Sequence, residues 1–296
     1  MTTTNSSHPL EDRQRIVELV ARLTDVPLDE VRRRFELEER EMGVNVRQGL
    51  EQRGIAPYVW SEKLVEFYEQ TDAFLYETLL WNRSPTKKVM QRWVVEFLER
   101  VGGTSQRVLL YGDGLGCDSY ELARAGHDVT YFEVSKRCRD FASELFLGKG
   151  GDFTIVDRSE ELPRAGFDAV VCLDVLEHVP DPPALVSQLA TWLRPGGHLL
   201  VHAPFFYVAP CVSTHLKSNQ KYSGDWRRLY GASGFEPVDG EFFWNPLALR
   251  LKQPGEPSRG SRLPLAARLG GLLLRLGALW SAPHIWVAKW LANKKA

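Results

Sequence analysis

The chain lacks the features that mark secreted, disulfide-bonded or nucleic-acid-binding proteins. Its 296 residues include only four cysteines, none in a C-x-x-C pair, which favours reduced thiols in a cytosolic setting. The N-terminal stretch MTTTNSSHPLEDRQR has no apolar run of the kind that a secretory signal requires. The formal net charge is −1, so no overall positive field attracts nucleic acid. We therefore expect a cytoplasmic globular protein with no nucleic-acid partner.

Acidic residues are missing from the last part of the chain. No Asp or Glu follows residue 256, whereas basic residues and tryptophans recur: Arg259, Arg262, Arg268, Arg275, Lys289, Lys294, Lys295, Trp280, Trp286 and Trp290. Two arginines and a proline interrupt the apolar runs, so none reaches the roughly 20 residues of a bilayer span. Residues 263–296 are predicted to form a basic amphipathic helix that could lie in an anionic membrane interface. The alternative is a helix packed on the domain or on the second subunit of a homodimer.

The most informative stretch is RVLLYGDGLGCDSYELARAGHDVTYFE, residues 107–133. An apolar strand leads into a turn with three glycines, Gly112, Gly114 and Gly116, and a short helix and a second strand follow. Glycine lets the backbone adopt positive φ and lets a ligand lie against main-chain N–H groups. The pattern predicts a nucleotide-binding βαβ unit.

Glu133 ends the second strand, twenty-one positions after Gly112. A carboxylate in this place can accept hydrogen bonds from both hydroxyls of a ribose. A dinucleotide fingerprint would need a glycine where Cys117 stands, in order to seat a pyrophosphate on the helix. The unit therefore predicts a cofactor with an adenosine-like ribose and no phosphate.

Four segments in this order resemble the class I S-adenosylmethionine-dependent methyltransferases, over about residues 88–252. They are the glycine turn with Glu133, FTIVDRSEELP (153–163), FDAVVCLDVLEHVPDP (167–182) and WLRPGGHLLVHAPF (192–205). The L-E-H-V segment is most similar to the small-molecule branch typified by the quinone-biosynthesis O-methyltransferases. That branch usually has an acidic residue where this chain has Leu110, so a contact to the methionyl end of the cofactor is missing or is supplied by Asp113.

The resemblance implies a doubly wound α/β fold with a mostly parallel, seven-stranded, Rossmann-like sheet, and S-adenosyl-L-methionine as the cofactor. Ligands of open α/β sheets bind where the strands end, near the switch point. The cofactor is thus expected to contact Gly112, Asp113, Gly114, Gly116, Glu133, Val134, Asp157, Arg158, Leu173 and Asp174. In the resembling family the acidic residue in the place of Asp157 accepts a hydrogen bond from the adenine amino group. An ordinary turn aspartate is the alternative.

Alternating strands and helices in the middle of the chain predict a parallel sheet with helices on both faces. A helical pattern precedes this region, and the linker PGEPSRGSR follows it. We divide the chain into a disordered tail (1–9), a helical N-terminal lid or appendage (10–101), a methyltransferase core (102–253), a linker (254–262) and a basic C-terminal helical segment (263–296).

Helix caps are expected at three places in the core. Asp118 or Ser119 is predicted to cap the helix after the glycine turn, because short polar side chains favour that position. Ser135 is predicted to cap the next helix, and Asp181 the helix that begins at Pro182.

A hydroxyl or amine acceptor must lose a proton, and histidine is the usual base near neutral pH. His178 lies just past the fourth strand and His215 in the loop after the fifth, so both are candidate catalytic bases. For His178 the alternative is a structural histidine that bonds backbone groups. Along a strand His198 and His202 would lie roughly 13 Å apart, so no metal site is expected.

The acceptor is expected to be a small aromatic or lipid-like molecule methylated on oxygen, with nitrogen and carbon acceptors as alternatives. In the resembling branch, the N-terminal helices and the insertion after the fifth strand line the acceptor pocket. Here they offer Tyr58, Trp60, Phe67, Tyr68, Trp81, Phe205, Phe206, Tyr207, Tyr222 and Trp226, although such a stripe is also typical of a plain core.

Two further functions stay open. One is a non-catalytic S-adenosylmethionine-binding module, which the departure at Leu110 favours. The other is a methyltransferase acting on protein or nucleic acid. Against a nucleic-acid substrate stands the absence of an N-P-P-Y or D-P-P-Y motif after the fourth strand, where this chain has D-V-L-E.

Overall fold

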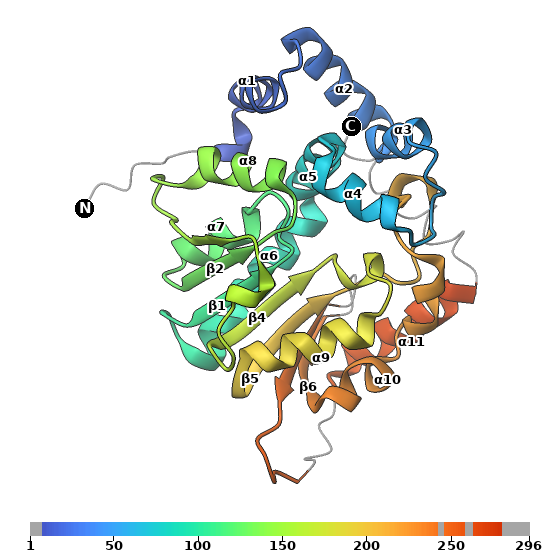
Figure 1. Cartoon of the computed structure of the whole chain (residues 1–296). Coiled ribbons are helices and arrows are strands. Elements are labelled where there is room, and N and C mark those ends of the chain that lie inside the picture. The colour runs from blue at the N-terminus through green and yellow to red at the C-terminus, as the bar shows by residue number, and fades with distance from the viewer. Residues whose placement is uncertain (1–7, 242–245, 258–262, 280–296) are drawn as a thin grey trace.

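The computed structural model describes residues 8–241, 246–257 and 263–279 (Figure 1). The predicted segments 1–9, 254–262 and 263–296 each extend beyond these ranges. The disorder expected at residues 1–7 and the three tryptophans of the last segment therefore lie outside the described residues.

A single seven-stranded sheet forms the centre of the described chain, in the order β3-β2-β1-β4-β5-β7-β6. Pairing from β3 to β5 is parallel, and β7 runs antiparallel to both of its neighbours, so the predicted mostly parallel α/β fold is confirmed. The chain order reverses between β1 and β4, which makes their carboxyl ends the switch point. The strands are β1 Arg107–Tyr111, β2 Asp128–Phe132, β3 Thr154–Val156, β4 Phe167–Leu173, β5 Leu193–His202, β6 Phe235–Gly240 and β7 Leu247–Leu251.

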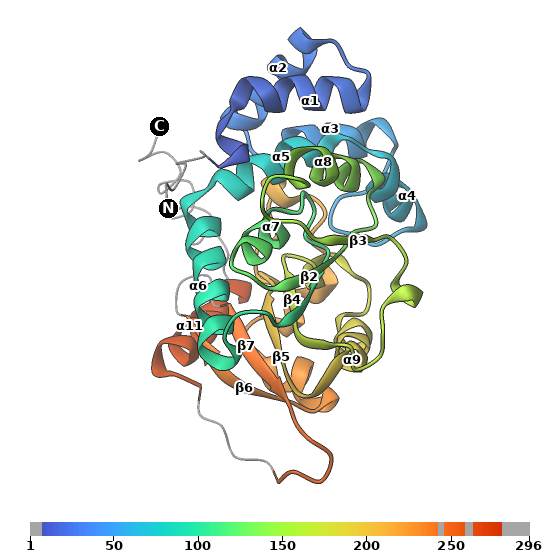
Figure 2. The same ribbon diagram turned by 90° about the vertical axis from the view of Figure 1, so that its left-hand side faces the viewer.

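Side chains alternate along the strands between two hydrophobic cores, one on each face of the sheet. Val108 and Leu110 of β1 belong to the core that α6, α7 and α8 cover, whereas Leu109 belongs to the core beneath α9 and α10. Figure 2 shows α6 and α9 on opposite sides of the strands. These helices are α6 Pro85–Gly102, α7 Cys117–Arg124, α8 Lys136–Phe146, α9 Pro182–Trp192 and α10 Trp226–Tyr230.

The N-terminal helices form a separate layer above the sheet (Figure 1). Each buries one apolar stripe. Phe35, whose ring packs against that of Tyr76, belongs to the same core that α6, α7 and α8 cover, so these helices are continuous with that side of the sheet. A partly buried ion pair between Arg34 and Asp72, at 2.6 Å, joins the second helix to the fifth. The helices are α1 Arg13–Thr24, α2 Leu28–Arg40, α3 Val44–Gln52, α4 Glu62–Gln70 and α5 Ala73–Arg83.

Two of the predicted caps are confirmed and the third is wrong. Ser135 accepts a hydrogen bond from the Cys138 N–H at the start of α8, and Asp181 does the same for Ala184 in α9. Gly116 occupies the N-cap position of α7, and it has no side chain with which to cap the helix. Asp118 and Ser119 lie inside the helix, and Asp113 of the preceding turn accepts hydrogen bonds from their N–H groups.

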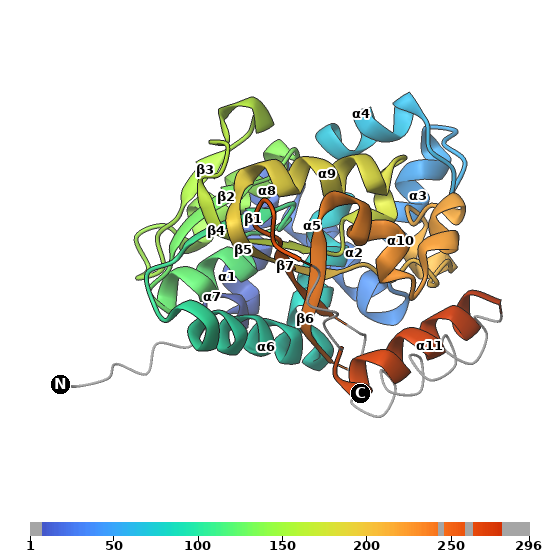
Figure 3. The ribbon, with the colours of Figure 1, turned by 90° about the horizontal axis from the view of Figure 1, so that it is seen from below.

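Helix α11 (Leu265–Leu279) lies beside β6 (Figure 3). Leu263 and Ala267 are buried against the core beneath α9 and α10. The opposite face of α11 exposes five leucines at helical spacing: Leu265, Leu269, Leu272, Leu273 and Leu276. No helix within the described ranges has the length and hydrophobicity needed to cross a membrane.

Candidate active site at the carboxyl ends of the strands

The glycine turn after β1 adopts a backbone that only glycine enters without strain. Gly112, Gly114 and Gly116 have φ angles of 73°, 57° and 74°. A Cβ on Gly112 would lie 2.7 Å from a methyl group of Val175, in the loop after β4. A Cβ on Gly114 would lie 3.3 Å from the methyl group of Thr78 in α5. Glycine here therefore keeps the turn open beneath two other segments of the chain.

The Asp113 carboxylate accepts hydrogen bonds from the start of the helix that follows the turn. One carboxylate oxygen accepts a hydrogen bond from the Ser119 N–H at 2.7 Å and from the Ser119 hydroxyl at 2.6 Å, and the other accepts from Asp118 N–H at 3.2 Å. These contacts satisfy donors at the start of α7 that have no partner within the helix. The side chain thereby fixes the angle at which the turn enters the helix.

Glu133 is buried at the tip of β2 and faces the glycine turn. Its carboxylate accepts hydrogen bonds from the Gly114 N–H at 2.9 Å and the Ser135 N–H at 2.8 Å. Burial raises the pKa of Glu133, and the two N–H donors oppose that rise. The residue that the spacing predicted as a ribose ligand thus lies against the middle glycine of the turn.

The remaining residues predicted after β2 and β3 lie at the rim of this region. Val134 is half exposed, and Asp157 accepts a hydrogen bond from Arg139 at 3.3 Å. Arg158 is exposed and donates to Glu161 at 2.6 Å. Asp157 and Arg158 therefore make ion pairs on the protein surface.

Asp174 follows Leu173 at the end of β4 and gathers partners from three other elements. It has a φ of 59°, unusual for a residue with a side chain. Its carboxylate accepts a hydrogen bond from the Trp81 indole at 2.9 Å and pairs with His202 at 2.5 Å and Lys87 at 3.7 Å. Burial opposes ionisation, but His202 and Lys87 hold the pKa of Asp174 well below its usual range.

Lys87 connects this carboxylate to the helix after the glycine turn. Its ammonium lies 2.8 Å from Asp118, and the side chains of both residues are almost fully buried. Gln91, one turn along α6, donates to the other oxygen of Asp118 at 2.8 Å. Burial lowers the pKa of Lys87, and the attraction of Asp118 and Asp174 more than offsets that effect. Sequence reasoning missed this network, because its members are far apart in the chain.

The two predicted catalytic histidines lie together. The rings of His178 and His215 meet edge to face with centroids 4.7 Å apart. Glu177 is fully buried between them, and its Oε1 atom lies 3.9 Å from the Nε2 atom of each. Burial lowers the pKa of His178 to about 4, and burial also holds the pKa of His215 well below its usual value. We refer to Glu177, His178 and His215 as the Glu177 cluster.

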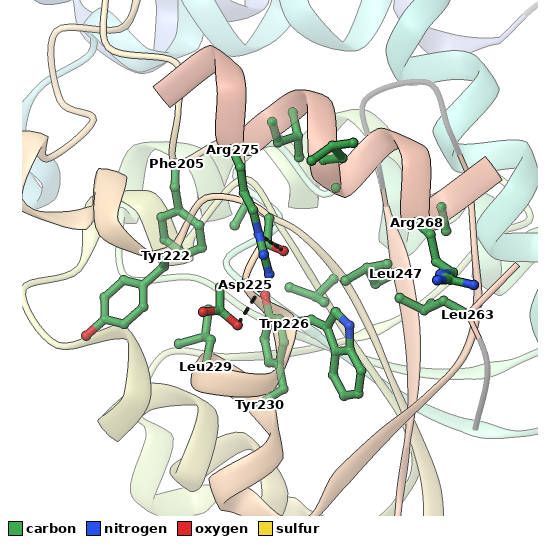
Figure 4. A pocket seen from close by; sticks show the side chains of 17 residues that line it. Phe205, Tyr222, Asp225, Trp226, Leu229, Tyr230, Leu247, Leu263, Arg268 and Arg275 are labelled. Carbon is green, nitrogen blue, oxygen red and sulfur yellow. Dashed lines mark hydrogen bonds and ion pairs between the residues drawn. The ribbon is translucent and has the colours of Figure 1, made fainter. Parts of the chain in front are cut away.

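Six of the ten aromatic residues predicted to line the acceptor pocket fall into three groups. Tyr68 and Tyr207 lie at the Glu177 cluster, where Tyr68 bonds His178 at 3.0 Å and the Tyr207 carbonyl accepts from His215 at 2.6 Å. Phe67 belongs to the core of the N-terminal helices. Phe205, Tyr222 and Trp226 line a cavity of about 200 Å³ beneath α11 (Figure 4).

Comparisons with known proteins agree with this architecture. Residues 82–236, about half of the chain, match a family model described as a methyltransferase domain. A ubiquinone biosynthesis O-methyltransferase from Xylella fastidiosa is 41% identical over 108 residues, 35% of this chain and 44% of that protein. Its counterpart from Photorhabdus laumondii is 37% identical over 108 residues, 34% of this chain and 45% of that protein. The chain thus spans less than half the length of these curated relatives.

One solved structure with a similar fold is the magnesium protoporphyrin IX methyltransferase from Synechocystis PCC 6803 with bound S-adenosylhomocysteine. It is 20% identical, with a TM-score of 0.49, and the match covers 65% of this chain and all of that one.

Proposed function

Since the chain belongs to the class I S-adenosylmethionine-dependent methyltransferases, we propose that it transfers a methyl group to an oxygen atom of a small aromatic or lipid-like acceptor. The family match covers the glycine turn, Glu133, Asp174 and the Glu177 cluster. Both relatives described above are named O-methyltransferases, which supports an oxygen acceptor.

The observation that carries this proposal is the position of Glu133. Its buried carboxylate is held against the Gly114 N–H, where a ribose laid on the turn would meet both. The glycines leave room for a ligand against the backbone, and Asp174 supplies a second fixed carboxylate at the switch point. We propose that S-adenosylmethionine is held by Gly112, Asp113, Gly114, Gly116, Glu133, Val134, Asp157, Arg158, Leu173 and Asp174. When bound, it supplies a methyl group on a positively charged sulfur.

We propose that the acceptor hydroxyl is held at the Glu177 cluster. Tyr68 and Tyr207 offer aromatic surface there, and both histidine rings are fixed through their Nδ1 atoms. The residues of this chain then have two tasks, to orient the acceptor oxygen and to help it lose its proton. The helical appendage, residues 10–101, serves as a lid, because α5 places Thr78 over the turn and Trp81 against Asp174 at the end of β4.

The test is a calorimetric titration of the purified protein with S-adenosylmethionine and S-adenosylhomocysteine. We expect Glu133→Ala to weaken binding by about 1–3 kcal/mol, since bonds to a carboxylate are unmade. Glu39→Ala is the matched control, because Glu39 is an exposed acid of α2 that pairs with Arg13, outside the proposed cofactor site. Absence of binding to either ligand would refute the assignment. Binding without turnover, in a screen of phenols, catechols and lipids read by mass spectrometry, would favour the non-catalytic module.

We also propose that the enzyme is cytoplasmic and that α11 brings it to the anionic inner face of a membrane. One face of α11 packs on the domain, and the other exposes five leucines. The sequence after residue 256 has basic but no acidic residues, so it complements an anionic surface. A lipid-like acceptor would be reached there.

Co-sedimentation with phosphatidylglycerol vesicles tests this proposal. We expect the full chain to bind these vesicles and to bind phosphatidylcholine vesicles less, and Leu272→Gln with Leu276→Gln to reduce binding. Val238→Gln, a change at an exposed apolar residue of β6, is the control. A concentration-dependent dimer that the leucine substitutions dissociate, without vesicle binding, would assign this face to a homodimer instead.

A further inference from the structure

The loops after β4 and β5 bring three metal-ligating groups together. Glu177 and His178 belong to the short 3₁₀ turn Leu176–His178, and His215 belongs to the connection between β5 and β6. One ligand atom from each of the three residues lies within 4.8 Å of the other two. The spacing of His198 and His202 along β5 predicted no metal site. Glu177, His178 and His215 lie in loops, to which strand spacing does not apply.

Both imidazoles are oriented as metal ligands usually are. His215 donates from Nδ1 to the Tyr207 carbonyl at 2.6 Å, which leaves the lone pair on Nε2. The Nδ1 atom of His178 lies 3.2 Å from the Thr214 carbonyl and 3.0 Å from the Tyr68 hydroxyl, so its Nε2 is the free ligand atom in the same way. Metal-bound histidines typically have their second nitrogen fixed by a carbonyl or carboxylate. Both Nε2 atoms lie at the same distance from Glu177.

The third group, the Glu177 carboxylate, has no hydrogen-bond partner among the described residues. Glu177 is only 1% exposed, and neither carboxylate oxygen accepts a hydrogen bond from any residue that the structure describes. A buried carboxylate in this condition requires an explanation, because nearly all buried polar groups are hydrogen-bonded, and a bound ion is one. We propose that Glu177, His178 and His215 bind a divalent transition-metal ion.

The donor set favours an ion of the zinc class over magnesium or calcium. Two imidazoles and one carboxylate are ligands that Zn²⁺ uses in catalytic sites, whereas Mg²⁺ and Ca²⁺ prefer oxygen alone. Tetrahedral ligands with bonds of about 2.1 Å lie about 3.4 Å apart, so side-chain movements of about 1 Å would close the cluster around an ion. Three protein ligands leave at least one coordination position for a further oxygen.

The role of the ion rests on the proposed function, but its binding does not. The Glu177 cluster follows Asp174 at the switch point, and Tyr68 and Tyr207 border it. An acceptor hydroxyl bound at the open position would release its proton to water more readily, as metal-bound water does. The two histidines would then assist proton loss as ligands of the ion.

The experiment measures metal binding by the full-length protein without cofactor or acceptor. After dialysis against EDTA, the protein is titrated with Co²⁺, whose visible absorption reports the ligands, and with Zn²⁺ and Mg²⁺ by calorimetry. Glu177→Gln and His215→Ala are compared with His198→Asn, a change at a histidine of β5 outside the cluster. Glu177→Gln keeps the size of the side chain and removes its charge. Circular dichroism establishes that each variant is folded.

We expect one equivalent of Co²⁺ or Zn²⁺ to bind the wild type and His198→Asn, with Mg²⁺ much weaker. Loss of a direct ligand should exceed the roughly 10–100-fold that loss of an outer partner usually causes. Unaltered affinity in folded Glu177→Gln, or no stoichiometric binding by the wild type, would overturn the proposal. Metal binding by a protein that transfers no methyl group would leave this site standing and count against the proposed function alone.

Discussion

The glycine turn after β1 and the Glu177 cluster after β4 lie at the same edge of the sheet, but their charged groups are held in opposite ways. Asp113 and Glu133 each accept two or more hydrogen bonds from the turn and its neighbours. Both oxygens of Glu177, by contrast, accept no hydrogen bond in the described part of the chain. The first region is organised by its own contacts, whereas the second is suited to a ligand that completes it.

Among the predicted substitutions, removal of the buried cation Lys87 beside the glycine turn should lower stability the most. We expect Lys87→Ala to lower the free energy of unfolding by about 3–5 kcal/mol, because it leaves the carboxylate of Asp118 buried without its cation and removes a positive charge near Asp174. Urea unfolding measures the change. Lys88→Ala removes an exposed lysine from the same helix and serves as the control. Similar losses in both variants would mean that the buried network contributes little to stability.

A smaller effect is expected where the two regions touch. Gly112→Ala should lower the free energy of unfolding by about 1–3 kcal/mol, because positive φ strains a residue with a Cβ and that atom would meet Val175. Gly255→Ala has the same strain, at a φ of 78°, but meets nothing within 4 Å. The difference between the two variants isolates the contact with Val175. Equal losses would indicate that the loop after β4 moves aside freely.

The smallest effect concerns the cap within the turn. Asp113→Ala should lower the free energy of unfolding by about 1 kcal/mol, the usual loss for a helix cap, and should also weaken cofactor binding because the turn loosens. Asp181→Ala removes the cap of α9, away from the turn, so it should lower stability similarly and leave cofactor affinity unchanged. Thermal unfolding and calorimetry together separate the two outcomes. If cofactor affinity falls equally in both variants, the cap at Asp113 has no special role.

Local patterns in the sequence were sufficient to predict the mostly parallel sheet and the glycine turn. Apolar strands, glycines at fixed offsets and cap residues such as Ser135 act over a few positions, so they can be read without knowing what lies nearby in space. The wrong cap at Asp118 shows the limit of this reasoning. A short polar residue was available at Asp118, but the helix already begins at Cys117. Asp113 accepts from the N–H groups of its first turn, and the carboxylate of Asp118 instead pairs with Lys87.

The candidate site could be predicted only in part, for a related reason. The spacing identified His178 and His215 as candidates, and the fold brings them together. Nothing in the sequence indicates that Glu177 turns inward between them, because the direction of a side chain in a loop follows no period. Trp81, which is predicted to line the acceptor pocket, also donates its indole N–H to Asp174, a contact that the sequence did not indicate.

The convergence on Asp174 also sets an order for the assembly of the site during synthesis. Its partners Trp81 and Lys87 precede it in the chain, but His202 follows it by 28 positions, at the end of β5. During synthesis, β1, β2 and the whole glycine turn would leave the ribosome before His202 is available to pair with the Asp174 carboxylate. Domains generally fold as units while synthesis proceeds. The cofactor should therefore not stabilise nascent chains that end before residue 202, and its binding would mark the point at which the core has closed.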